Sequence, residues 1–263
     1  MSFVEIVIIG AIAMVLLGAM VVGLVIWQQK LVIQHKLTIQ NKDLQLQRER
    51  LIAVLQGQEQ ERKRIAEDLH DEVGAQLSVL KLNLGGLQPL LKTGNGEAER
   101  LKETKDFTDT IIQQLRFISQ SLHPQALENL GLSHALDSFC NLMNKNKQVQ
   151  ITFKTNDNGQ AQAIDKDKAL NIYRVVQELI NNILKHAQAT TVTITYQHTP
   201  NQLILTVADD GNGALVNSLQ QSRKKTGSLG LKNIESRLNI INGNINFTPG
   251  TPKGTLATIT VDI

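Results

Sequence analysis

The sequence is poor in several residue types, and each shortage excludes a class of protein. Among 263 residues there is one cysteine, Cys140, so neither a disulfide framework nor a cysteine-rich zinc site can form within the chain. Aromatic residues make up 3% of the sequence, which leaves little for stacking on nucleic-acid bases. The net charge of +3 comes without a long block of Lys or Arg, so we do not expect direct binding to nucleic acid.

Two common phosphate-binding signatures are missing as well. The sequence contains neither G-x-x-x-x-G-K-[S/T] nor G-x-G-x-x-G. Phosphate chemistry that uses a P-loop, or the kinase fold with a glycine-rich strand loop, is therefore not expected.

The N-terminal segment is the one long apolar run. From Phe3 to Trp27 every residue except Glu5 is apolar, glycine or otherwise uncharged, which is long enough for a helix across a bilayer. We expect residues 1–28 to form a single transmembrane helix, with no external sensor domain in this chain. The positive-inside rule places the following part in the cytoplasm, because basic residues come soon after the segment: Lys30, Lys36, Lys42, Arg48 and Arg50.

Two helical patterns follow the apolar segment. Over residues 29–57, Leu37, Leu44 and Leu51 are seven apart, which suits a short parallel coiled coil. Residues 58–123 predict a hairpin of two amphipathic helices, the second of which stops at Pro124. Two such helices cannot bury their apolar stripes alone, so we expect a homodimer with a four-helix bundle.

The remaining part of the chain, residues 124–263, mixes helical and strand patterns. We expect an α+β sandwich of about one domain. The expected helices are 130–143, 166–187 and 229–242, and a polar, glycine-containing loop is expected at 211–227. The expected strands are 149–154, 191–197, 203–208, 245–247 and 255–261.

A histidine in the first hairpin helix is the first candidate for chemistry. His70 lies one step from the apolar stripe that includes Leu69, so it should be at the edge of the bundle and accessible. A neutral imidazole is a usable nucleophile, and a nearby carboxylate can hold one ring nitrogen. Asp71 is the candidate carboxylate, and Glu67, one turn earlier, is the alternative. The simpler interpretation is a solvated histidine on a charged helix face.

The helix expected at 166–187 carries a second group of polar residues. Glu178, Asn182 and the pair Lys185/His186 are spaced so that they share one face. A carboxylate, an amide oxygen and a cation suit Mg²⁺ and a phosphate group. An ordinary amphipathic helix with a polar outer side would show the same spacing.

Three glycine-containing segments complete the candidates. Asp209 ends a strand, where its carboxylate could accept the amine of adenine, and Gly211 and Gly213 would let the backbone approach the base. The segment from Gly227 to Gly230 opens a helix, whose free N–H groups attract phosphate. A turn and a helix cap are the simpler interpretations of these two segments, and Lys253-Gly254-Thr255 could be only a strand entry.

Taken in order, these segments resemble the two-component sensor histidine kinases of the nitrate-sensor and desaturase-regulator subfamily, over about residues 58–263. E-R-K-R-I-A-E-D-L-H-D-E-V-G-A-Q-L-S resembles the phosphoacceptor box, and L-H-P-Q-A-L-E-N-L-G-L-S-H-A-L resembles the junction that follows the hairpin. Q-E-L-I-N-N-I-L-K-H-A resembles the N-box. D-D-G-N-G and G-S-L-G-L-K-N-I resemble the glycine boxes of the ATPase fold shared with gyrase, Hsp90 and MutL.

The resemblance implies a role for each candidate residue. His70 would be phosphorylated, and Asp71 would orient or deprotonate it. Asn182 would coordinate Mg²⁺ with Glu178 close by. The other residues implied to hold ATP are Lys185 and His186 at the phosphates, Asp209, Gly211, Gly213 and Thr255 around adenine, and Gly227 and Gly230 in the lid.

The function that the resemblance implies is ATP-dependent autophosphorylation on His70, followed by transfer to an aspartate of a response regulator. It also implies a location in the bacterial cytoplasmic membrane, where a separate membrane sensor could be a partner. The alternative is a non-catalytic, membrane-tethered ATP-binding module. A serine kinase of the same ATPase fold is a further alternative, but such proteins generally lack the helical hairpin.

Two positions depart from the subfamily pattern. The subfamily usually has Gln or His five residues after the phosphoacceptor, where it positions water to dephosphorylate the partner. Here that position is Ala75, and Gln76 follows it, rotated by about 100° in a uniform α-helix. We therefore expect weak or no phosphatase activity. Ser228 stands where many relatives have glycine, which affects the lid.

Overall fold

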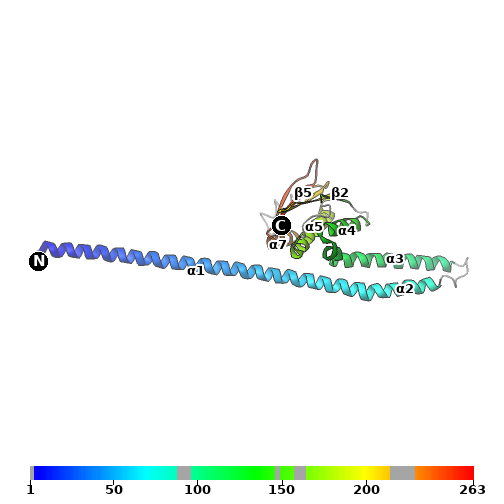
Figure 1. Cartoon of the computed structure of the whole chain (residues 1–263), viewed down its shortest axis with the longest axis horizontal. Helices are drawn as coiled ribbons and strands as arrows, with labels where there is room; N and C mark the ends of the chain where they lie inside the picture. The colour runs from blue at the N-terminus through cyan, green and yellow to red at the C-terminus, as the bar shows by residue number, and fades with distance from the viewer. Residues whose placement is uncertain (1–2, 88–95, 146–148, 157–163, 214–228) are drawn as a thin grey trace. The chain divides into compact units, whose positions relative to one another are not determined.

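The computed structural model describes residues 3–87, 96–145, 149–156, 164–213 and 229–263 (Figure 1). The chain divides into two compact units, Met1–Leu55 and Gln56–Ile263. The first unit is entirely helical, and the second contains the hairpin and the α/β part.

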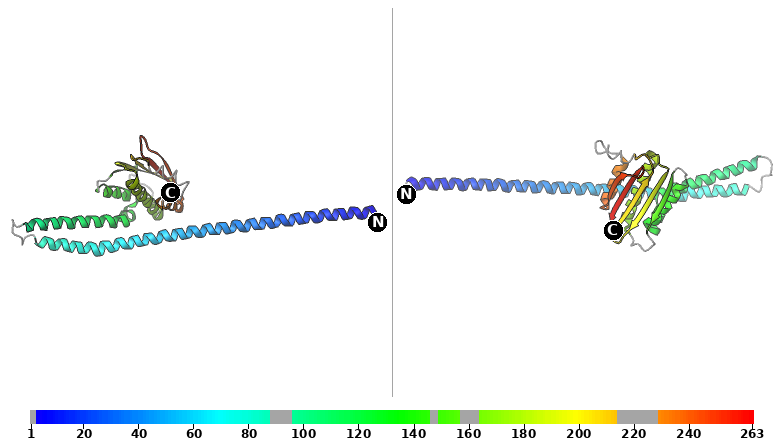
Figure 2. Two further views of the ribbon diagram at one scale, coloured as in Figure 1. Left: turned by 180° about the vertical axis from the view of Figure 1, so that it is seen from behind. Right: turned by 90° about the horizontal axis from the view of Figure 1, so that it is seen from above.

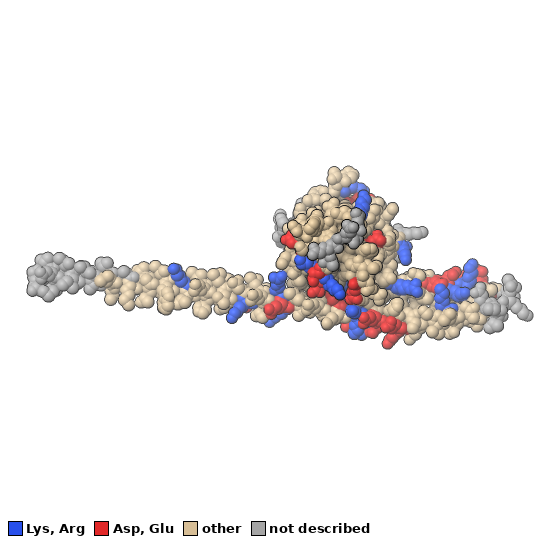
Figure 3. Space-filling model, viewed as in Figure 1, with Lys and Arg blue, Asp and Glu red and all other residues tan. Residues whose placement is uncertain are grey.

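The first unit consists of most of helix α1 (Phe3–Asp68). Among the described residues, this is the one helix that by length and composition could cross a membrane. Its described apolar side chains are exposed: Met14 is 79% exposed and Trp27 is 61% exposed. No Asp, Glu, Lys or Arg occurs from Met14 to Gln29, and the described N-terminal end of the helix shows no charged side chain on the face seen in Figure 3, as a lipid-facing segment requires. The α1 helix runs without interruption through residues 28 and 57, where domain boundaries were predicted.

The hairpin follows at the end of α1. A π-helical turn, η1 (Leu69–Val73), joins α1 to α2 (Gly74–Leu87), and α3 (Glu97–Leu122) returns beside them. The Ser119 hydroxyl donates a 3.1 Å hydrogen bond to the Ala66 carbonyl, and Lys81 forms a 2.6 Å ion pair with Asp109. The apolar stripe is left partly exposed, and Leu80 is 44% exposed. The hairpin therefore keeps the apolar face for which the sequence predicts a second copy.

The α/β part confirms the predicted fold class. Its sheet has the order β1-β2-β3-β5-β4, with β1 parallel to β2 and every other pair antiparallel. Figure 2 shows the sheet lying over the helices. Its strands are β1 (Gln150–Thr155), β2 (Thr191–His198), β3 (Gln202–Asp209), β4 (Asn244–Pro249) and β5 (Thr255–Asp262). Its helices are α4 (Gln125–Asn144), α5 (Lys166–His186) and α7 (Leu229–Ile240).

The core lies between the sheet and these helices. Alternate residues of the strands, such as Ile194 and Leu205, are fully buried against the apolar face of α5, which includes Leu179 and Ile183. The α5 helix begins at Asp165, whose carboxylate accepts hydrogen bonds from the next backbone N–H groups. Because α5 buries its apolar face in the core, its opposite, polar face must point away from the core.

The helix predicted over 130–143 is the second part of α4. A short first part, which was not predicted, begins at Gln125 directly after Pro124, which suits a helix start because its missing N–H is not needed there. Gly131 interrupts α4 with φ 85°, a conformation that glycine adopts readily. The predicted loop at 211–227 lies mostly outside the described residues.

Candidate functional site

His70 lies in the π-turn η1 and its side chain is exposed, as the sequence predicted. The turn buries none of its residues, and its backbone closes with Gly74 N–H donating to the Leu69 carbonyl, an i→i+5 bond. Among the residues that the structure describes, the imidazole forms no hydrogen bond with Asp71 or Glu67. The choice between these two carboxylates therefore stays open.

The π-turn changes the register of the residues after His70. An i→i+5 bond places one more residue in the turn than an α-helical i→i+4 bond does. Gln76 is therefore rotated toward the angular position that residue 75 would have in a uniform α-helix. The expectation of weak phosphatase activity assumed a uniform helix, and that premise does not hold at this turn.

The polar face of α5 meets the start of α7. Gly230 lies against the Glu178 carboxylate, and a Cβ at Gly230 would also come within 3.5 Å of both Asn182 side-chain heteroatoms. The Asn182 Nδ2 atom is buried without a hydrogen-bond partner in the described structure. The structure thus brings the N-box and the second glycine box together around an amide group that lacks a partner.

The C-terminal end of α5 contacts the first glycine box. Lys185 and His186 are exposed there. Asn212 donates from its backbone N–H to the Ala187 carbonyl at 2.9 Å and from Nδ2 to the His186 carbonyl at 3.4 Å. These bonds place the two side chains beside the glycine box that follows β3.

Asp209 is buried at the end of β3, with 6% of its surface exposed. Its Oδ1 accepts a 2.8 Å hydrogen bond from the Gly211 N–H, whereas Oδ2 is buried without a partner among the described residues. Burial raises the pKa of the Asp209 carboxyl, and the backbone N–H groups of Gly211 and Thr255 oppose that rise only in part. A buried carboxylate oxygen without a donor fits a ligand that supplies an N–H.

Thr255 lies beside Asp209 because β3 and β5 are paired at that end. It is 1% exposed, and its Oγ1 has no partner among the described atoms. Gly254, with φ 94°, packs against the Asp209 carbonyl and leaves no room for a Cβ. Gly213 has φ 71°, and a Cβ built on it would lie 3.5 Å from the Gly254 carbonyl oxygen. The three segments therefore converge at this end of the sheet.

Two residues near the site were not among the sequence candidates. Gly254 was seen only as a neighbour of Thr255, although a glycine directly before a buried strand residue signals close backbone approach. Asp210 accepts hydrogen bonds from the Thr190 and Thr191 backbone N–H groups at 2.7 and 3.0 Å, and bonds from these residues lower its pKa. Asp210 thus fixes the turn that presents Asp209. Gly227 lies outside the described residues.

The described residues contain no group of three or more His, Cys, Asp or Glu side chains that could hold a metal alone. A cation near Asn182 would therefore need ligands from another molecule, such as phosphate oxygens.

Two protein families match the sequence at the places where these groups lie. The profile described as "Histidine kinase" matches residues 61–127, and the profile described as "Histidine kinase-, DNA gyrase B-, and HSP90-like ATPase" matches residues 167–263. The chain belongs to the histidine kinase family. The first match contains His70, and the second contains Asn182, Asp209 and Thr255. Residues 167–263 are therefore an ATP-binding type of domain.

A curated relative supports this family. The chain is 32% identical over 228 residues to the oxygen sensor histidine kinase NreB of Staphylococcus carnosus (strain TM300). The matched region covers 86% of this chain and 63% of that relative, so the chain spans less than two thirds of the relative's length.

Among solved structures, the histidine kinase domain of a blue-light activated histidine kinase from Erythrobacter litoralis is 18% identical, with a TM-score of 0.44. That match covers 71% of this chain and 94% of the solved chain. A second structure of the blue-light activated kinase is 22% identical, with a TM-score of 0.41 and 65% and 63% of the two chains covered. These TM-scores are low, so the family rests on the sequence matches.

Proposed function

We propose that this chain is a membrane-anchored protein-histidine kinase that transfers the γ-phosphate of ATP to His70 and then to an aspartate of a response regulator. The observation that carries the proposal is the set of three buried polar atoms without partners: Asn182 Nδ2, Asp209 Oδ2 and Thr255 Oγ1. Buried polar atoms are nearly always satisfied, so their grouping beside close-packed glycines supports a nucleotide site.

Each part of the site has a role that follows from its chemistry. Asp209 accepts the amine of adenine through Oδ2, while the Gly211 N–H holds Oδ1 in place. Asn182 holds Mg²⁺ together with the phosphates, with Glu178 close by. Lys185 and His186 lie exposed near the phosphates and neutralise their charge. Gly227 and Gly230 belong to the lid, and Thr255 lies beside adenine.

His70 provides the acceptor nitrogen. Phosphoryl transfer needs positioning and charge neutralisation more than covalent help from the protein. The exposed imidazole can be approached by the nucleotide, and Asp71 holds its second nitrogen as a hydrogen-bond donor so that the first can attack. The attacking ring nitrogen uses its lone pair to form the N–P bond, the O–P bond to ADP breaks, and ADP leaves with the electrons of that bond. The other ring nitrogen can then pass its proton to Asp71.

Exposed surfaces of the chain support three partners: a second copy, a membrane and a response regulator. The partly exposed stripe of the hairpin, with Val73 at 38% and Leu80 at 44%, supports a homodimer through a four-helix bundle. The apolar start of α1 supports a single-pass anchor in the bacterial cytoplasmic membrane, with the α/β part in the cytoplasm. A response regulator would meet His70 on the exposed side of η1.

Incubation of the full chain with γ-labelled ATP and Mg²⁺ tests the proposal. We expect acid-labile, alkali-stable label on the protein, lost in His70→Ala and retained in His134→Ala, which removes an exposed histidine of α4. ATP binding without any label would instead favour the non-catalytic ATP-binding module. Acid-stable label that persists in His70→Ala would indicate a serine kinase.

A further inference from the structure

The root of the hairpin is tied to the α/β part by one buried carboxylate. Glu59 of α1 accepts hydrogen bonds from Arg174 of α5, with Nη2 at 2.6 Å and Nε at 2.9 Å, and from Arg237 Nη2 of α7 at 2.8 Å. The three side chains are 15%, 4% and 9% exposed, respectively. Helices far apart in sequence therefore meet at one group of charges.

Ionised Glu59 offsets part of the positive charge of this group. Burial alone would raise the pKa of Glu59, but its hydrogen bond with Arg174 and the charges of Arg174, Arg237 and Arg62 together lower it. The arginines oppose one another, since the charges of Arg174 and Arg62 each lower the pKa of Arg237. Neutralising Glu59 would leave these cations facing one another without the carboxylate between them.

Arg174 also holds the end of α3. Its Nη1 and Nη2 donate to the carbonyls of Ser121 and Leu122 at 3.0 and 2.7 Å. These carbonyls belong to the last turn, where the helix offers no N–H partner and carries partial negative charge. Gln177 adds a 3.2 Å bond to the Ser121 carbonyl. The α5 helix is thus attached to both helices of the hairpin.

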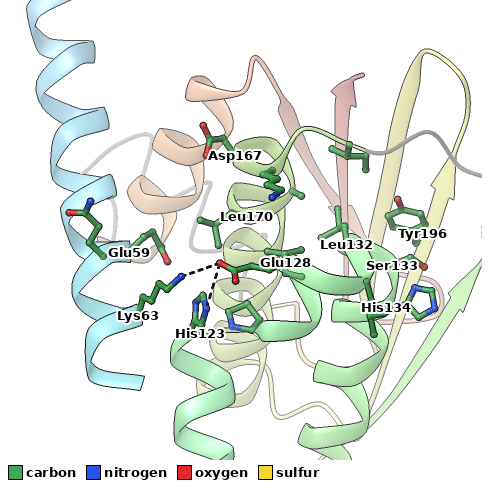
Figure 4. A pocket seen from close by; sticks show the side chains of 18 residues that line it. Glu59, Lys63, His123, Glu128, Leu132, Ser133, His134, Asp167, Leu170 and Tyr196 are labelled. Atoms are coloured by element: carbon green, nitrogen blue, oxygen red, sulfur yellow. Dashed lines mark ion pairs between the residues drawn. The ribbon is translucent and has the colours of Figure 1, made fainter. Parts of the chain in front are cut away.

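A cavity lies beside these bonds. It has a volume of about 660 Å³ and adjoins Glu59, with Lys63 of α1 on one side and Leu127 and Leu170 on the other. Figure 4 shows Glu128 in this cavity between Lys63 and His123, each at 3.6 Å. Charged groups beside such a cavity can exchange their bonds with one another for bonds with water when the contact opens.

The same helix carries the nucleotide group. Arg174, Glu178 and Asn182 lie at i, i+4 and i+8, so they share a face of α5. Glu59 is eleven residues before His70, or roughly 16 Å along the helix. The exposed His70 has no hydrogen bond or ion pair with the described residues of the α/β part. The structure therefore shows α5 held at the hairpin root while the acceptor is free.

We propose that the Glu59–Arg174–Arg237 cluster is an autoinhibitory latch, which holds the ATP-binding part at the hairpin root and must open before a nucleotide reaches His70. The latch rests on the proposed kinase function. Opening exchanges the Glu59 bonds for water and frees α5 to move toward the acceptor. A shift of the α1 helix that withdraws Glu59 would open the latch, which makes this residue a control point for the signal.

The test measures the initial rate of His70 labelling by γ-labelled ATP in the full chain. Glu59→Gln keeps the shape of the side chain and removes its charge. We expect labelling to rise about fivefold or more, the range of a modest conformational coupling, with unchanged ATP affinity. Asp109→Asn is the matched control, since it breaks a 2.6 Å ion pair within the hairpin that lies outside the latch, and its rate should equal that of the wild type.

Arg237→Gln provides a second variant, because it leaves the Glu59–Arg174 pair in place and should give a smaller rise. If Glu59→Gln fails to fold or to bind ATP, Arg237→Gln decides the question. An unchanged or lower rate in the deciding variant overturns the latch, whether or not the rate of the control changes. Absence of label from the wild type and from every folded variant overturns the kinase function instead, and label in Glu59→Gln alone supports both proposals.

Discussion

The Glu178 carboxylate lies directly against Gly230, so the N-box helix and the start of α7 meet where only glycine leaves enough room. A Cβ at Gly230 would press on Glu178 and approach Asn182. The contact joins residues that lie 52 positions apart in sequence, and it gives the second glycine box a steric role besides any role in binding phosphate.

Gly230→Ala should therefore weaken nucleotide binding. Overpacking of this kind costs about 1–3 kcal/mol, so the affinity for ATP should fall by about fivefold or more. Titration with a fluorescent ATP analogue measures the change. Gly86→Ala is the control, because a Cβ there meets nothing within 4 Å. Equal affinities in the two variants would show that the contact does not shape the site.

Asp209→Asn should separate nucleotide binding from stability. The loss of a charged acceptor for the adenine amine costs about 1.5–3 kcal/mol, so ATP affinity should fall about tenfold or more. Folding should not suffer, because asparagine removes the cost of burying a charge and its Oδ1 can still accept the Gly211 N–H. Thermal unfolding with and without ATP gives both quantities. A less stable ATP-free variant would contradict this account.

The stability of Asp209→Asn relative to the wild type should change with pH in one direction. Burial raises the pKa of the Asp209 carboxyl in the folded protein, so the folded chain holds its proton more tightly than the unfolded chain. The contribution of Asp209 is greatest below the unfolded pKa of about 3.9 and is lost as the pH rises through the folded pKa. The difference in melting temperature between Asp209→Asn and the wild type should therefore grow, in favour of the variant, as the pH rises through this window. A constant difference would show that Asp209 does not titrate as its burial requires.

The base beside His70 can be assigned by kinetics. Asp71→Asn should reduce the labelling rate by about 100-fold, as loss of a positioned base or orienting carboxylate does, whereas Glu67→Gln should have a much smaller effect. Initial rates at saturating ATP, with ATP affinity measured separately, distinguish this from a binding defect. A larger loss of labelling rate in Glu67→Gln than in Asp71→Asn would assign the role to Glu67.

The π-turn predicts which residue supports dephosphorylation of the response regulator. With η1 present, Gln76 is rotated toward the position of residue 75 of a uniform helix, so we expect decay of the phosphorylated partner to depend on Gln76. Gln76→Ala should slow the decay by at least about tenfold, whereas Ala75→Ser should leave it unchanged. If the phosphorylated response regulator decays equally slowly with the wild type, with the variants and without kinase, the expectation of weak or no phosphatase activity stands.

The sequence predicted the α/β part well because its signals are local. Alternation in β2 and β3 and the periodicity of α5 each act over a few residues, and the observed ends lie within one or two positions of the expected ones. The grouping of Asp209 with Thr255 could also be anticipated, although only from the order of the motifs. Strand pairing supplies the physical reason for it.

Other features could not be predicted from periodicity. The π-turn is a choice of hydrogen bond within a run that reads as α-helix throughout, so a pattern of side chains does not reveal it. Glu59 belongs to a polar stretch in which nothing marks it as buried, and its partners Arg174 and Arg237 lie more than a hundred positions away. Charge clusters of this kind depend on the meeting of three helices, which local sequence does not encode.

The bonds from Arg174 to the last carbonyls of α3 also bear on how the protein can be divided. Pro124 follows α3 closely and has no N–H to offer, so these carbonyls rely on a side chain from α5. A hairpin fragment cut at residue 123 would keep its interhelical contacts but expose that terminus to water. Such a fragment should fray from its C-terminal end, and dissection at this boundary would alter the hairpin as well as remove the ATPase domain.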